Sequence, residues 1–117
     1  MELVKFKKNG GLVTINIVIN GLVAWRYVYV TDTHNYVKTS SDPAPCIHVL
    51  GFPDTLEGDV NSWDIQLANV SDSDQDYKIE VAWEQNGAVL KTWLDSGNIA
   101  SDTAKVVSAN AWLIGVV

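Results

Sequence analysis

Apolar and polar residues alternate along most of the chain, and the spacing typical of helices is nearly absent. In residues 13–19, 23–29, 63–67 and 77–83, an apolar residue stands at every second position. A period of two is typical of strands that bury one face and expose the other to solvent. The sequence therefore predicts an all-β protein.

Turn residues separate these runs. Asn-Gly pairs stand at 9–10, 20–21 and 86–87, each between two strand-like runs, and this pair tolerates the positive φ of tight hairpins. The first three strands are expected to form a meander, and the strands flanking 86–87 a later hairpin. We expect about nine strands, at residues 3–8, 12–19, 22–31, 46–50, 63–70, 77–84, 88–94, 103–108 and 112–117.

Nine short strands indicate a β-sandwich or a small barrel, and the connections between them favour a two-sheet antiparallel β-sandwich. The long connections at 31–46 and 51–62 suit crossings between two sheets. The pattern resembles immunoglobulin-like and fibronectin-like sandwiches, and this resemblance concerns architecture alone. Because domains of ~100–150 residues are the commonest, residues 1–117 are expected to form a single domain.

Hairpin register decides which tryptophans face the core. In the first hairpin we expect Ile15 to face Trp25, because that register gathers the apolar residues on one face. In the later hairpin, a two-residue loop pairs Trp83 with Leu90 and leaves Trp93 outside among charged residues. A three-residue loop would turn Trp93 inward instead.

The charge balance disfavours several partners. Eight Lys and Arg stand against fourteen Asp and Glu, for a net charge of −6. Phosphate contacts need clustered basic residues, so nucleic-acid binding is disfavoured and no nucleic-acid partner is expected. Binding to anionic membranes is disfavoured as well. Residues 1–11 lack the apolar segment of a signal peptide. A cytoplasmic location is the default expectation, and export by another route stays open.

Catalytic and metal-binding motifs are sparse. The single cysteine, Cys46, excludes an intrachain disulfide. With His48 on the same strand and His34 in the preceding loop, it supplies too few ligands for a convincing zinc site. The chain has no nucleophile elbow, HExxH motif, P-loop or dinucleotide fingerprint. We therefore expect neither enzymatic activity nor a cofactor.

The loops carry the main chemical expectation. If successive strands alternate in direction, loops 9–11, 32–45, 71–76 and 95–102 share one end of the domain. That end would hold seven of the fourteen acidic residues, namely Asp32, Asp42, Asp72, Asp74, Asp76, Asp95 and Asp102. Loops on a rigid sandwich commonly bind ligands. The plain alternative is that Asp and Ser are simply good turn residues.

The run from Asp72 to Asp76 begins like a calcium-binding loop. Tyr77 stands where such a loop needs glycine, and Trp83 where it needs glutamate. An EF-hand is therefore rejected. An irregular calcium site stays open beside a solvated polar turn.

These observations favour a non-catalytic binding module whose partner is a carbohydrate or a protein surface. Aromatic rings stack on sugars, and carboxylates and amides accept hydrogen bonds from hydroxyl groups. The expected ligand-binding residues are Asp32, His34, Asn35, Tyr36, Asp72, Asp74, Asp76 and Trp93. The alternative is a structural or assembly subunit. Residues 111–117 are almost wholly apolar, so this strand is either central in a sheet or covered by a second subunit in a homo- or hetero-oligomer.

Overall fold

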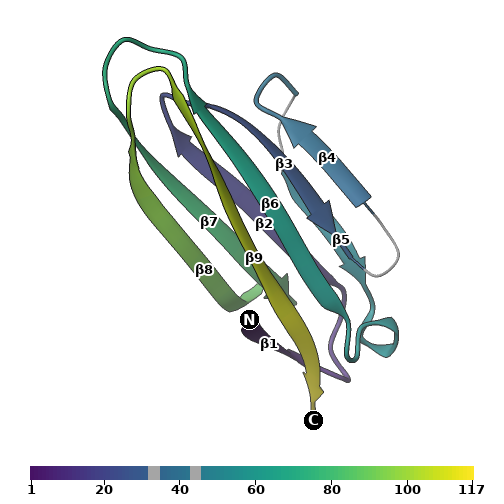
Figure 1. Cartoon of the computed structure of the whole chain (residues 1–117). Coiled ribbons are helices and arrows are strands. Elements are labelled where there is room, and N and C mark those ends of the chain that lie inside the picture. The colour runs from purple at the N-terminus through teal and green to yellow at the C-terminus, as the bar shows by residue number, and fades with distance from the viewer. Residues whose placement is uncertain (32–34, 43–45) are drawn as a thin grey trace.

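The computed structural model describes residues 1–31, 35–42 and 46–117. The described residues form two facing sheets and one turn of 3-10 helix at Pro53–Thr55 (Figure 1). The predicted all-β, two-sheet sandwich is confirmed. Its strands are β1 (Glu2–Lys7), β2 (Val13–Gly21), β3 (Ala24–Val30), β4 (Asn35–Thr39), β5 (Ile47–Gly51), β6 (Val60–Asn69), β7 (Gln75–Gln85), β8 (Ala88–Ile99) and β9 (Thr103–Val116).

The strands divide into a sheet of five and a sheet of four. Sheet A has the order β1-β9-β6-β3-β4, and sheet B has the order β5-β2-β7-β8. Paired strands are antiparallel except β1 and β9, which run parallel. In an immunoglobulin sandwich the last strand lies beside the strand before it, whereas here β8 and β9 belong to different sheets. The resemblance therefore extends to the architecture and not to the strand order.

The expected meander of the first three strands is wrong. β1 and β3 lie in sheet A and β2 lies in sheet B, so the turns at 9–10 and 20–21 join strands of opposite sheets. Ile15 pairs with Trp83, and Trp25 pairs with Leu67, rather than with each other. Two strands with apolar inner faces satisfy the same alternation whether they lie side by side or face each other across the core.

The later hairpin has the predicted turn but a shifted register. Asn86 and Gly87 form a two-residue loop with φ of 54° and 75°. A bulge then inserts Leu90, so Trp83 lies opposite Lys91 instead. The expectation that Trp93 faces outward is wrong. It lies on the inner side of β8, half-buried against the core.

The predicted number of strands is right although two assignments are wrong. The sequence pattern missed β4 and divided the continuous strand β9 in two. The C-terminal segment is central, as one of the two expectations had it, because β9 lies between β1 and β6.

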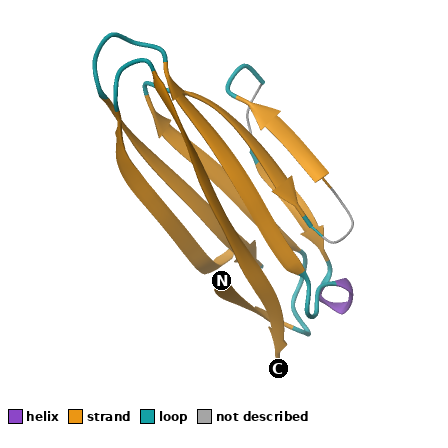
Figure 2. Ribbon diagram, in the orientation of Figure 1, coloured by secondary structure: helices purple, strands orange, loops and turns teal. Residues whose placement is uncertain are grey.

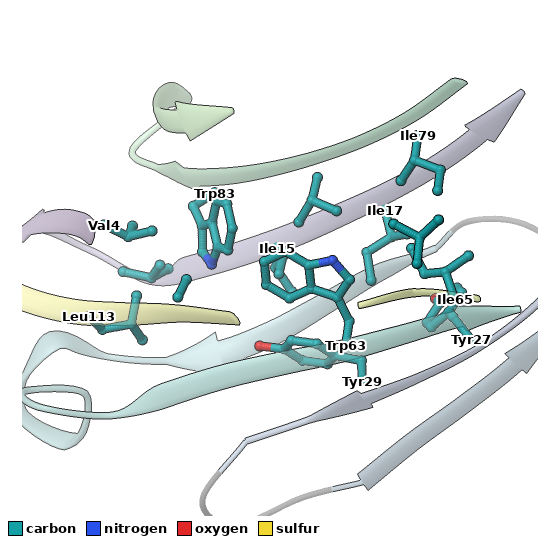
Figure 3. Packing of buried hydrophobic residues seen from close by; sticks show 14 of the residues in the cluster. Val4, Ile15, Ile17, Tyr27, Tyr29, Trp63, Ile65, Ile79, Trp83 and Leu113 are labelled. Atoms are coloured by element: carbon teal, nitrogen blue, oxygen red, sulfur yellow. The ribbon is translucent and has the colours of Figure 1, made fainter. Parts of the chain in front are cut away.

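The core fills the space between the sheets. Trp63 of β6 and Trp83 of β7 project toward each other from opposite sheets, with ring centroids 5.5 Å apart (Figure 3). Trp83 donates a hydrogen bond from Nε1 to Oδ1 of buried Asn61 at 3.2 Å. Ile15 and Ile79 of sheet B are fully buried in the same core. Because the strands are long, the connecting loops gather at the two ends of the molecule (Figure 2).

Candidate functional site

The segments of the predicted rim are divided between the two ends, although Asp42, Asp72, Asp74, Asp76 and Asp102 lie at the same end. Asn35 pairs with Val30, which pairs with Ser62 near the start of β6. Asp72 follows the other end of β6, beyond Asn69. Seven residues of strand separate these two levels, or roughly 24 Å at ~3.4 Å per residue. Asn35 and Tyr36 of β4 therefore lie far from residues 72–76.

The other loops of the rim are also redistributed. Gly11 lies at the end opposite the 72–76 run, because its carbonyl accepts a hydrogen bond from Gln85 at the end of β7. The 100–102 loop does share an end with the 72–76 run, as expected, through hydrogen bonds between the two loops. Asp32 and His34 lie outside the described residues. The unpredicted strand β4 causes the error, since one extra strand moves each following loop to the other end.

The carboxylates of the 72–76 run hold neighbouring segments together. Asp74 Oδ1 accepts a hydrogen bond from the backbone N–H of Ser101 at 3.1 Å. Asp76 Oδ1 accepts one from Asn98 Nδ2 at 3.0 Å. Buried Asn69 donates from Nδ2 to the carbonyls of Ser73 and Ile99. The described ranges contain no group of three or more His, Cys, Asp or Glu arranged to hold a metal ion.

Tyr36 belongs to a different cluster, which we call the aromatic seam: Trp25, Tyr27, Tyr29, Tyr36 and His48. It lines the side of the sandwich where β4 and β5 are the edge strands. The His48 ring stacks on Tyr36 with centroids 4.5 Å apart and on Tyr29 at 5.6 Å. His48 Nε2 is hydrogen-bonded to the Tyr27 hydroxyl at 2.8 Å.

Burial controls ionisation in the aromatic seam. Desolvation raises the pKa of Tyr27 and of Tyr29 well above the ordinary tyrosine value. Desolvation, and to a lesser extent the charge of Lys38, lowers the pKa of His48 below its ordinary value. All three side chains are therefore neutral at neutral pH. The seam can stack and form hydrogen bonds, and it mainly joins the edge of sheet B to sheet A.

Trp93 borders a hollow on the opposite side of the sandwich. β1 pairs only with residues 111–116 of β9, so residues 103–110 have no partner strand on that side within the described part of the chain. A depression of about 450 Å³ lies where β1 begins. We call it the Trp93 notch, and its lining residues are Met1, Glu2, Trp93, Ser108, Ala109 and Asn110.

The Trp93 notch combines an aromatic ring with polar groups. The indole of Trp93 packs against buried Trp63, with ring centroids 5.4 Å apart and planes inclined by 70°. The Glu2 carboxylate lies 3.9 Å from the ammonium of Lys91. Ser108 and Asn110 stand on the neighbouring strand β9. Sequence reasoning missed these polar residues, because only the pairing of the two terminal strands brings them beside Trp93.

No family model matches the chain, and no similar protein was found among curated proteins or solved structures. Within residues 1–31, 35–42 and 46–117, no helix is long and apolar enough to cross a membrane. The functional proposal therefore rests on the geometry of this chain alone.

Proposed function

We propose that this protein is a non-catalytic binding module that binds carbohydrate in the Trp93 notch. A sugar ring presents apolar C–H groups on its faces and hydroxyl groups at its rim. Trp93 offers an apolar ring, while Glu2 and Asn110 offer hydrogen-bonding groups beside it. The observation that carries the proposal is this pairing of a half-buried tryptophan with polar walls in one hollow.

The notch has a suitable size and rigidity. Its volume of about 450 Å³ falls within the ~300–1,000 Å³ of typical small-molecule sites. Trp93 packs against the core at Trp63, so little side-chain freedom would be lost on binding. A preorganised ring is favourable for weak ligands such as sugars.

The charge of the notch favours a neutral ligand. The carboxylate of Glu2 lies close to the ammonium of Lys91, and the other polar residues that line the notch, Ser108 and Asn110, are uncharged. Opposite charges in close proximity offset each other, while each group still donates or accepts hydrogen bonds. A neutral polyhydroxylated ligand matches this surface better than an ion.

A glycan array, run with calcium and with a chelator, tests the proposal. We expect binding in both conditions. For the sugar that binds best, Asn110→Ala and Glu2→Gln should each weaken affinity about fivefold, because a lost hydrogen bond costs about 1 kcal/mol. Asp72→Ala, at the acidic turn, is the matched control and should bind normally. A blank array, or loss of binding in Asp72→Ala alone, would refute the site.

A further inference from the structure

The outward face of sheet B carries five exposed apolar side chains among its polar ones. The outer side of an antiparallel sheet is ordinarily polar, yet Leu94 of β8 is 57% exposed. Exposed apolar side chains on such a face mark interaction surfaces when they gather. The exposed apolar residues whose side chains point outward from sheet B are Val18, Ile47, Val49, Val89 and Leu94.

The outward face of sheet A carries a second apolar group. Leu3 of β1 pairs with Trp112 of β9, which in turn pairs with Val60 of β6. Leu3 is 46% exposed and Trp112 is 44% exposed. Trp112 is therefore a large aromatic side chain on an open sheet surface, a common anchor in protein interfaces.

The two faces carry opposite charge. Sheet A presents Lys5, Lys7 and Arg26 outward, and its outward acid Asp64 accepts a hydrogen bond from Ser108. The outward surface of sheet A is thus basic, on a chain whose net charge is −6.

Sheet B presents the complementary charge. Glu80 and Glu84 of β7 point outward with the single base Lys78. Glu80 lies between the exposed apolar residues Val18 and Leu94. We call these outward surfaces face A and face B.

The edges formed by β4 and β8 are less suited to association. An inward-pointing charged residue on an edge strand opposes the addition of another strand. Lys38 of β4 shares the inner side with Tyr27, and Lys91 of β8 stands opposite Trp83. The bulge in β8 further distorts that edge.

We propose that face A of one copy of this chain docks on face B of a second copy. Trp112 and Leu3 on face A and the exposed apolar side chains of face B would supply affinity. The lysines and glutamates would set orientation, since exposed ion pairs contribute little energy by themselves. The contact joins different surfaces, so each docked pair leaves one face A and one face B open. Such heterologous contacts continue into open stacks rather than closing as a dimer. This inference does not depend on sugar binding, although Ser108 and Asn110 of the Trp93 notch stand on the same outward side of β9 as Trp112.

Sedimentation velocity at low salt over a concentration series tests the stacking. We expect the mean mass of the unaltered chain to rise steadily beyond that of a dimer. The double variants Lys5→Glu/Lys7→Glu and Glu80→Lys/Glu84→Lys should each remain monomeric, because their two faces then carry like charge. Lys8→Glu/Lys105→Glu makes the same charge change outside both faces and should assemble normally.

The decisive experiment mixes the two double variants, Lys5→Glu/Lys7→Glu and Glu80→Lys/Glu84→Lys. In an equimolar mixture every face A again meets a face B of opposite charge, so assembly should return, which also shows that both variants are folded. Trp112→Thr should weaken association on the order of tenfold or more. A strictly monomeric or strictly dimeric wild type, or a mixture that stays monomeric, would overturn the proposal.

Discussion

Gln85 joins the end of β7 to the crossover between β1 and β2. Its Oε1 accepts a hydrogen bond from the backbone N–H of Lys7 at 2.9 Å. Its Nε2 donates to the carbonyls of Lys7 at 2.9 Å and of Gly11 at 3.1 Å. The side chain is only 4% exposed. Gln85→Met keeps the approximate size of the side chain and removes all three hydrogen bonds.

The expected cost follows from those three bonds. A hydrogen bond contributes about 1 kcal/mol net to folding stability. A buried backbone group left without a hydrogen-bond partner costs about 1–3 kcal/mol. Since water can reach part of this turn, we expect the free energy of unfolding to fall by about 3 kcal/mol. That is a large share of the ~5–15 kcal/mol typical of a domain.

Urea denaturation followed by tryptophan fluorescence measures this change. Gln66→Met, on the exposed outward side of β6, is the matched control and should alter stability by less than about 0.5 kcal/mol. Gln85→Glu should also destabilise strongly at neutral pH, because its carboxylate would face the carbonyls of Lys7 and Gly11. A Gln85→Met protein as stable as the control would refute the reasoning.

Two further predictions concern pH and backbone geometry. Burial lowers the pKa of His48 below its ordinary 6.5, so the unfolded chain binds more protons between the two values. The free energy of unfolding should therefore fall as the pH drops through 6.5, and a pH series of urea melts should show a smaller fall in His48→Gln. Gly21 has a φ of +132°, and a Cβ there would lie 2.5 Å from the Asp76 carbonyl oxygen. Gly21→Ala should thus cost more than about 2 kcal/mol, against about 1 kcal/mol for Gly58→Ala, whose φ is also positive but which has open space around it; equal losses in thermal or urea melts would contradict this.

The alternation of apolar residues was sufficient to predict the fold class but not the strand partners. Alternation in β2 and β3 indicates which side of each strand is buried. It is silent on whether the neighbour is the next strand or one across the core. The pairing of Ile15 with Trp83 spans most of the chain, and no local signal encodes it.

Edge strands and bulges account for the remaining errors. β4 exposes Val37 and turns Lys38 inward, which inverts the usual pattern and hides the strand. The inserted Leu90 reverses the side on which Trp93 lies. The Trp93 notch could not be predicted, because it depends on pairing between Glu2 and Ala111 at opposite ends of the sequence.

The parallel pairing of the first and last strands has a mechanical consequence. The ladder runs from Glu2 beside Ala111 to Lys7 beside Val116. The first residue of β1 and the last residue of β9 therefore lie at opposite ends of the ladder. Tension applied through Glu2 and Val116 would slide the strands past each other. All the bonds of the ladder would then bear the load together instead of opening one by one. The ladder between β1 and β9 should therefore resist tension applied through Glu2 and Val116.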